Sequence, residues 1–366
     1  MSNGRPDAKR KDAAPLDADE FARIMAACGE AGEHVAVGVS GGADSMALGL
    51  LLSHWGQAFG VQVTALTVDH ALRAGSKAEA AQVGTWLSSH TLDHHILTWH
   101  HEACVTSAVQ ARARDARYRL MGDWCRANGV TRLLTAHHQG DQAETVLMRL
   151  KKGTTLFGLA AMETTRDLDG IALCRPLLAV PKARLIATLH ALGQDWVEDP
   201  SNHNQAYERV RVRQHLDVLA SEGVTAARLA GAARGARAVR EILDGAADTL
   251  IEAHTELRGQ GVAVAASFWD APDVVCGRAL AKVLTCVGAT TYAPSPAKLE
   301  RLYAWMARGP GASGGRTLGG CLVRPKGADF LISPQPPRKR PVKVQKSGLY
   351  CAEALAPEPQ KPYIQS

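Results

Sequence analysis

The chain has 366 residues, of which 46% are hydrophobic and 21% are charged, as in an ordinary globular protein. At about 150 residues per domain this length predicts two domains or slightly more, enough to fold without disulfide or metal staples. Lysines and arginines number 42 against 36 acids, a net charge of +6 that only mildly favours a polyanionic partner. No apolar run reaches the roughly 18 residues of a membrane span, and the N-terminal region has no apolar signal segment. We therefore expect a cytoplasmic protein, neither secreted nor bound to a membrane.

The eight cysteines are scattered and form no C-x-x-C pair. This spacing gives no support to a zinc ribbon, a dithiol redox motif or closely paired iron–sulfur ligands. Isolated cysteines are typical of small buried apolar residues in a reducing compartment.

From about Phe21 onward, short apolar runs alternate with segments of helix length. We expect strands at 35–39, 63–68, 96–99, 133–136 and 171–174, and helices at 45–55, 77–89, 107–128 and 141–151. This alternation predicts an α/β fold with a doubly wound, parallel five-stranded sheet. Right-handed crossovers place every strand-to-helix loop at one edge of the sheet, where such folds bind ligands.

The composition changes along the chain and predicts four segments. Residues 1–19 are polar and predict a flexible tail, and residues 20–213 form the α/β domain. Residues 214–330 are Ala-rich with helical patterning and predict a smaller, mainly helical domain. Residues 331–366 predict a proline-rich basic tail.

A Ser-Gly-Gly turn follows the first expected strand and leads into a helix. The turn comprises Ser40, Gly41, Gly42, Ala43, Asp44 and Ser45. Glycines leave room for a ligand against the main chain, and hydroxyls, successive N–H groups and the helix N-terminus together favour phosphate. No Gly-Lys-[Ser/Thr] is present, so the pattern favours an enzyme that holds leaving pyrophosphate. Asp44 would hold a Mg²⁺ that bridges it to the phosphates; the alternative is a glycine-rich turn without a ligand.

This loop resembles that of the N-type ATP pyrophosphatases, the PP-loop superfamily. Three further stretches resemble one family within it, the tRNA(Ile)-lysidine synthases. They are Thr67–Arg73, Thr135–Arg149 and Trp196–Asn202, the last followed by the Arg-x-Arg-x-Arg run at 209–213. The four motifs span 35–213 in the expected order, and the chain resembles the short form of the family. It departs from the family pattern at Ala71, Gly140 and Val210, where Gly, Asp and Asn are usual.

The resemblance implies ATP-dependent joining of lysine to the wobble cytidine of tRNA(Ile) with a CAU anticodon. Cytosine O2 would attack the α-phosphate, pyrophosphate would leave, and lysine would then displace AMP. ATP and Mg²⁺ are the implied cofactors, L-lysine and this tRNA the partners; residues 20–213 would be catalytic and 214–330 would bind tRNA. One alternative is a thiolating enzyme of the same superfamily, although those often carry C-x-x-C pairs. The other is an ATP-binding module that regulates a partner without chemistry.

Candidate site residues follow two of the expected strands. Asp69 and His70 end the second strand, where a nucleotide is often held. His137 follows the fourth strand and is the better catalytic candidate by resemblance. Asp141 and Glu144 share a helix face and would hold magnesium or accept protons from the incoming amine, although acids at a helix N-terminus also simply favour its dipole.

Basic residues beyond 208 predict RNA contacts. Arg209, Arg211 and Arg213 alternate: in an extended segment they would project on one side, whereas in a helix they would be spread around its surface. Three guanidinium groups in a row suit RNA phosphates. Further arginines at 228, 234, 237 and 240 would reach the phosphates of the anticodon stem. In both cases the alternative is a solvated basic surface.

Overall fold

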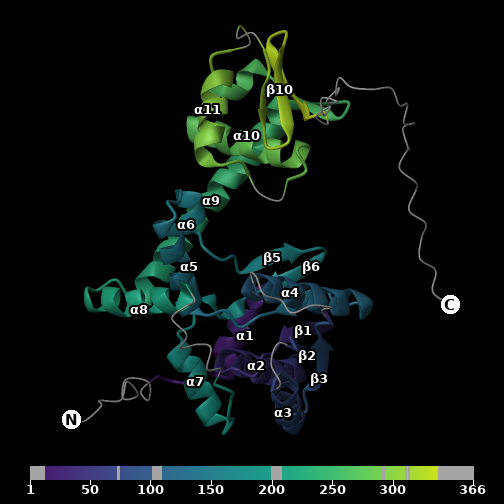
Figure 1. Ribbon diagram of the computed structural model, residues 1–366, viewed down its shortest axis with the longest axis vertical. Coiled ribbons are helices and arrows are strands. Elements are labelled where there is room, and N and C mark those ends of the chain that lie inside the picture. Colours follow the sequence, from purple (N-terminus) through teal and green to yellow (C-terminus); the bar gives the residue numbers. More distant parts are fainter. Residues whose placement is uncertain are drawn as a thin grey trace, which may run out of the picture. The chain divides into compact units, whose positions relative to one another are not determined.

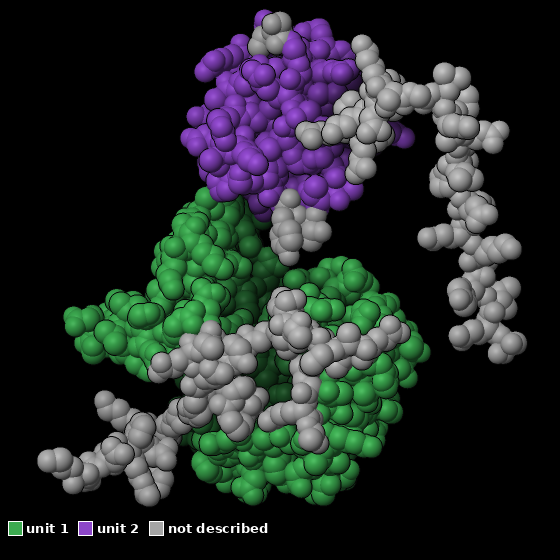
Figure 2. Space-filling model, in the orientation of Figure 1, with its two compact units in different colours: residues 1–249 green, residues 250–366 purple. Residues whose placement is uncertain are grey.

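The computed structural model describes residues 13–71, 75–100, 109–198, 208–290, 293–309, 311 and 314–336. The chain divides into two compact units, residues 1–249 and 250–366 (Figure 2). The division lies within helix α9 (Ala226–His254) and not at 213, where we expected it. Among the described helices, none combines the length and apolarity needed to cross a bilayer.

Unit 1 is built on a six-stranded sheet in the order β3-β2-β1-β4-β6-β5 (Figure 1). Its strands are β1 (His34–Gly38), β2 (Gln62–Asp69), β3 (Asp93–Thr98), β4 (Arg132–Leu134), β5 (Thr165–Leu168) and β6 (Ile171–Cys174). The pairs β1–β2, β1–β4, β2–β3 and β4–β6 are parallel, which confirms the five expected parallel strands. The sixth strand, β5, pairs antiparallel with β6 as a hairpin at the sheet edge.

Helices lie on both faces of this sheet, as a doubly wound fold requires. The helices are α1 (Ala18–Ala26), α2 (Ala43–Phe59), α3 (Ser76–Ser89), α4 (Val109–Ala127), α5 (Gln139–Lys151), α6 (Leu156–Leu159), α7 (Lys182–Ala191) and α8 (Glu208–Ser221), with the 3₁₀ turn η2 (Pro176–Ala179). Of these, α6 and α8 pack on α5. In β1, Val35 and Val37 join the core under α1, α2, α3 and α7, whereas Ala36 joins the core under α4. The alternating side chains of one strand therefore serve two cores.

The packed part of the chain begins closer to the N-terminus than we expected. Residues 1–12 lie outside the described part, but Leu16 is 5% exposed and its N–H donates to Thr188 Oγ1 at 2.9 Å. Arg184 binds the carbonyl oxygens of Ala14 and Pro15 and pairs with Glu20. The chain from Ala14 onward therefore packs against α7, and the prediction of a flexible tail is wrong for residues 14–19.

Unit 2 contains an antiparallel sheet that the prediction of a mainly helical domain at 214–330 did not include. It holds α10 (Asp273–Val287), α11 (Pro296–Met306), the 3₁₀ turn η4 (Ala266–Asp270) and an antiparallel sheet of order β7-β8-β11-β10-β9. The strands are β7 (Thr255–Arg258), β8 (Gly261–Val264), β9 (Arg316–Leu318), β10 (Cys321–Lys326) and β11 (Asp329–Pro334). Gly259, Gly319 and Gly327 have positive φ in the three tight hairpins. The expected tail at 331–366 is wrong for residues 331–334, which belong to β11; residues 337–366 lie outside the described part.

Candidate active site

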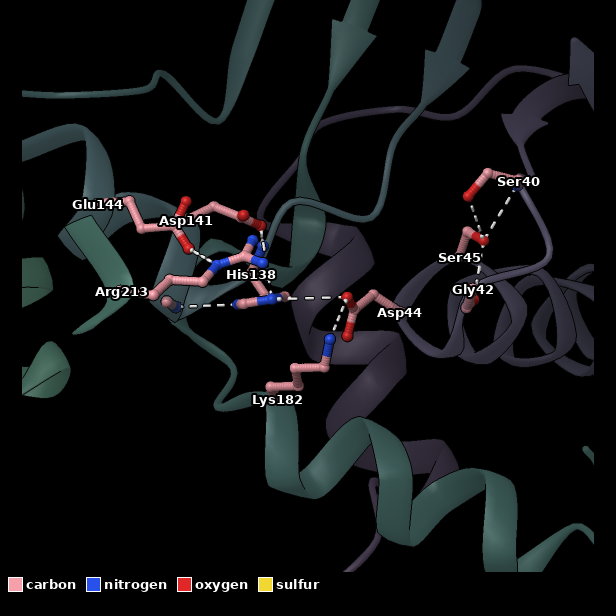
Figure 3. A network of polar contacts seen from close by, with 10 residues as sticks. Ser40, Gly42, Asp44, Ser45, His138, Asp141, Glu144, Lys182 and Arg213 are labelled. Carbon is pink, nitrogen blue, oxygen red and sulfur yellow. Dashed lines mark hydrogen bonds and ion pairs between the residues drawn. The ribbon is translucent and has the colours of Figure 1, made fainter. Parts of the chain in front are cut away.

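The Ser-Gly-Gly loop joins β1 to α2 and is braced from inside. The Ser45 hydroxyl accepts from the N–H of Ser40 at 3.1 Å and donates to the carbonyl of Gly42 at 2.9 Å (Figure 3). Gly41 has φ +84°, and a Cβ there would lie 2.7 Å from Val83 Cγ2, so packing and backbone both require glycine. The carbonyl of Gly41 also accepts from the N–H of Val197 at 2.9 Å, which ties the Trp196–Asn202 motif to the loop.

The open end of this loop suits an anion. Gly42 is the N-cap of α2 and gives no side-chain cap, so the first-turn N–H groups are not covered by it. A Cβ at Gly42 would meet only Ser40 Oγ, at 3.9 Å, so packing does not explain this glycine. Ser40 is exposed whereas Ser45 is buried. Backbone donors at a helix N-terminus, with room against the main chain, fit a phosphate group.

Asp44 connects the loop to residues from two other elements. Its Oδ2 accepts from Lys182 Nζ at 3.2 Å and lies 3.6 Å from Nε2 of His138 (Figure 3). Its Oδ1 is buried and has no hydrogen-bond partner among the described residues. A buried carboxylate oxygen is costly unless it is paired. Mg²⁺ takes one or two carboxylates together with substrate phosphates, so Asp44 fits the predicted magnesium ligand.

His138 is the N-cap of α5 and lies between two carboxylates. Its Nδ1 accepts from the N–H of Gly140 at 2.9 Å, so in the neutral ring the proton is on Nε2. That Nε2 is 3.6 Å from Asp44 Oδ2 and 3.6 Å from Asp141 Oδ2. Asp141 Oδ2 in turn accepts from the backbone N–H of His138 at 2.9 Å, which completes a capping box. His138 thus positions the two acids relative to each other.

His137 and Asp141 differ in charge because of their surroundings. Burial lowers the pKa of His137 to about 4, so the ring is neutral near pH 7; its Nδ1 lies 3.1 Å from Thr135 Oγ1. Burial alone would raise the pKa of Asp141, but His138 and its backbone N–H hold it below the ordinary value. A neutral imidazole beside an ionised carboxylate is suited to proton transfer.

Glu144 is deeply buried, and only one of its two carboxylate oxygens has a hydrogen-bond partner among the described residues. Its side chain is 4% exposed, and Oε1 accepts from Arg213 Nε at 2.5 Å. Oε2 is buried without a hydrogen-bond partner in the described part of the chain. Burial raises the pKa of Glu144, against the opposing effect of Arg213. An unpaired oxygen on a buried acid is costly, and a cationic or hydrogen-bonding ligand at this atom would remove that cost.

The three alternating arginines lie on helix α8, so the helical arrangement holds and the extended one does not. Arg209 and Arg213 are four residues apart and share a face, whereas Arg211 lies on another face and Val212 is buried. Arg213 binds Glu144, and the charge of Arg209 lowers the pKa of both His137 and Asp141. The face with Arg209 and Arg213 therefore belongs to the acid cluster on α5.

Asp69 and His70 lie at the end of β2, at the carboxyl edge of the sheet. Asp69 Oδ1 accepts from the N–H of Ala71 at 2.9 Å; the Ser76 hydroxyl and this N–H lower the pKa of Asp69. Burial and Arg117 lower the pKa of His70 to about 4, and its ring packs edge-on against Trp99. The Asp69 carboxylate thus supports the turn, and nucleotide binding by these two residues stays a prediction.

The backbone at Ala71 and the packing at Gly140 bear on two departures from the family pattern. Ala71 has φ +51°, a left-handed conformation in which glycine costs less, which is why glycine is usual there. A Cβ at Gly140 would lie 2.7 Å from His138 Cε1, so an aspartate at 140 would displace that ring. Among the described residues, no group of three or more metal-binding side chains is present, and a two-aspartate magnesium site at 140–141 is absent.

Comparison with known proteins defines the class and then the family. A family profile described as a PP-loop domain matches residues 16–219. The chain therefore carries the PP-loop fold and loop of the ATP pyrophosphatases. It is 42% identical over 350 residues to a tRNA(Ile)-lysidine synthase from Methylobacterium nodulans, covering 89% of this chain and 98% of that protein. A tRNA(Ile)-lysidine synthase from Bradyrhizobium sp. strain BTAi1 is 37% identical, with 93% and 99% covered. The chain belongs to the tRNA(Ile)-lysidine synthase family.

A solved structure supports the fold. The U34-tRNA thiolase NcsA from Methanococcus maripaludis superimposes with a TM-score of 0.52 at 15% sequence identity. The match covers 60% of this chain and 78% of the thiolase.

Sequence reasoning missed Lys182. It treated His138 only as a possible core or capping residue and assigned it no role in catalysis. Lys182 begins α7, directly after η2 and therefore beyond the carboxyl end of the parallel strand β6. Its position at the common sheet edge was the available signal. For His138 the signal was its place before an acidic helix start, typical of an N-cap.

Proposed function

We propose that the chain is an ATP-dependent ligase that joins lysine to C2 of the wobble cytidine of tRNA(Ile) with a CAU anticodon. Cytosine O2 attacks the α-phosphate of ATP and pyrophosphate leaves. The lysine ε-amine then attacks C2, and AMP leaves with the oxygen. The observation that carries the proposal is one continuous polar network from the phosphate-binding loop through Asp44 and His138 to Asp141 on α5.

The first half of this network suits adenylation. The N-terminus of α2 and the exposed Ser40 would bind pyrophosphate, while Asp44 Oδ1 would hold Mg²⁺. A metal ion held there would supply positive charge to the phosphates and so favour departure of pyrophosphate. His137, neutral at pH 7, would accept or pass a proton near Asp141.

The second half suits lysine. The unpaired Oε2 of Glu144 and the ionised Asp141 would bind the ε-ammonium and take up the proton that it must lose before attack. Arg213 holds Glu144 in place through Oε1. Arg209, on the same face of α8, would contact an RNA or nucleotide phosphate.

The test is a turnover assay with ATP, labelled lysine and a panel of purified tRNAs. We expect release of pyrophosphate and AMP, and incorporation of lysine, only with tRNA(Ile) carrying CAU. Pyrophosphate release with labelled sulfur entering tRNA would instead support the thiolating alternative. ATP binding without any turnover would support the regulatory module and reject the ligase.

Lys182 is expected to supply the cation that the loop itself lacks. Its ammonium lies 3.2 Å from Asp44 Oδ2 at the N-terminus of α2, and its side chain is 45% exposed and free to turn toward a bound phosphate. A hydrogen bond to a charged group contributes about 1.5–3 kcal/mol, so Lys182→Met should raise the KM for ATP by ~10- to 100-fold. Lys182→Arg should keep much of the affinity. The measurement is pyrophosphate release against ATP concentration.

Lys152→Met removes an exposed lysine at the C-cap of α5 and serves as the matched control. We expect it to leave the KM for ATP unchanged. An unchanged KM in Lys182→Met would show that this lysine only neutralises Asp44.

A further inference from the structure

The arginines expected to contact tRNA beyond α8 are largely used within the chain. Arg237 donates to Thr164 Oγ1 at 2.9 Å and to the carbonyl of Met162. Arg240 pairs with Glu163 at 2.7 Å. Arg228 donates to the carbonyl of Gly223 at 2.7 Å. These three side chains stabilise unit 1, so any wider tRNA contact needs other cations.

A basic pocket in unit 2 offers such cations. It has a volume of about 390 Å³ and is lined by Lys298, Arg301, Leu302, Arg316, Thr317 and Leu318. Three of these six residues are cations and none is an acid. The three cationic residues are exposed, whereas Leu302 is buried and forms part of the floor. A concave surface with one sign of charge concentrates anions.

The pocket is built by a helix and an edge strand. Lys298, Arg301 and Leu302 have the i, i+3, i+4 spacing of one face of α11, and Arg316–Leu318 is β9, the last strand in the order of the unit 2 sheet. Glu300 lies two residues from Lys298 and so projects from another face of the helix. Hairpin pairing with β10 fixes Arg316 opposite Val323.

The cations are positioned without being neutralised. Arg316 stacks over the ring of Trp305 at 5.5 Å, and Arg301 Nε donates to the carbonyl of Ala297 at 3.1 Å. Within the part of the chain that the structure describes, none of the three forms a salt bridge. A guanidinium held by stacking keeps its donors free for a phosphate.

We infer that this pocket binds phosphates of the tRNA backbone, as a second RNA contact remote in sequence from the chemistry. The inference rests on the proposed function for the identity of the RNA. Phosphodiesters fit better than a small ligand, because the lining offers three exposed cations and, besides them, one polar side chain, that of Thr317. Such contacts increase affinity in a salt-dependent manner without selecting a sequence.

The test compares full-length variants in tRNA binding and lysine incorporation. The triple variant Lys298→Gln, Arg301→Gln, Arg316→Gln should raise the Kd and KM for tRNA by about tenfold or more. The slope of log Kd against log salt should fall by about one per lost contact. At saturating tRNA, kcat and the KM for ATP should stay as in the wild type. Unchanged Kd and slope would overturn the inference.

Two further variants keep the result interpretable. The control Arg308→Gln, Arg324→Gln, Lys326→Gln removes the same charge from exposed positions of unit 2 outside the pocket, and we expect a smaller salt effect. An equal change of the Kd and the salt slope in both triple variants would indicate a non-specific effect of charge. It would also overturn the inference that the pocket binds tRNA. The double variant Lys298→Gln, Arg301→Gln leaves the stacked Arg316 in place and serves if the triple variant unfolds. We expect it to raise the Kd for tRNA and lower the salt slope, in the same direction as the triple variant.

The outcome separates this inference from the proposed function. Lysine incorporation by both wild type and pocket variant, with identical tRNA affinity, rejects the pocket and keeps the ligase. Wild-type binding of tRNA without incorporation rejects the ligase, while the salt slopes still decide whether the pocket contacts RNA.

Discussion

Asp44→Asn is expected to reduce tRNA-dependent pyrophosphate release by about a thousandfold or more. The substitution keeps the shape of the side chain and an acceptor for Lys182 but removes the charge that would hold Mg²⁺. A metal contributes several kcal/mol of transition-state stabilisation, and each 1.36 kcal/mol is about tenfold in rate. Because lysine enters after adenylation, AMP formation and lysine incorporation should fall with pyrophosphate release. Rapid-quench measurement of pyrophosphate in the absence of lysine isolates this step.

Asp19→Asn is the matched control. Asp19 is the second residue of α1, as Asp44 is the second residue of α2, so both carboxylates favour a helix dipole equally. Asp19 is exposed and has no place in the polar network. We expect both variants to unfold at similar temperatures and only Asp44→Asn to lose activity. Adenylation near the wild-type rate in Asp44→Asn would remove Asp44 from the chemistry.

The sequence predicts the centre of unit 1 well because the side chains of β1, β2, β4 and β6 are mostly buried on both faces of the sheet. The runs at Val35, Leu133 and Ile171 are apolar without interruption, and the run from Val63 is interrupted only by two buried threonines, Thr64 and Thr67; such runs are typical of central parallel strands. The short strand β5 was not predicted, because it is an exposed edge strand without an apolar run. A motif that follows a parallel strand also lies at a known edge, so Asp44 and Asp141 could be placed in one site from topology alone.

Unit 2 and α8 show where local patterns fail. Strands β7 and β9 have three or four residues and are mostly exposed, so no period-two apolar pattern marks them. The alternation of Arg and Val at 209–213 favours a strand, yet packing of α8 against α5 buries only Val212 and fixes a helix. Likewise the contact of Lys182 with Asp44 joins residues 138 positions apart, which spacing does not reveal.

Glu144→Gln is expected to separate the two steps of the reaction. Glutamine keeps an oxygen for Arg213 but loses the negative charge at Oε2, where we place the lysine ammonium. We expect pyrophosphate release to stay within about fivefold of wild type, while the KM for lysine rises and lysine incorporation falls by ~100-fold, as expected for a charge-assisted contact and a proton acceptor. Single-turnover experiments that follow pyrophosphate and AMP separately measure the two steps.

The pH dependence of the same variant tests the role of the charge. Because burial raises the pKa of Glu144, its carboxylate is protonated at a higher pH than an exposed glutamate as the solution is acidified. The wild-type rate constant for lysine transfer should therefore fall on acidification through that raised pKa, and Glu144→Gln should lack this acid limb. Glu163→Gln, which alters the Glu163–Arg240 pair elsewhere in unit 1, should keep both the rate and the acid limb. Parallel loss of pyrophosphate release and lysine transfer in Glu144→Gln would instead assign Glu144 to adenylation, together with Asp44.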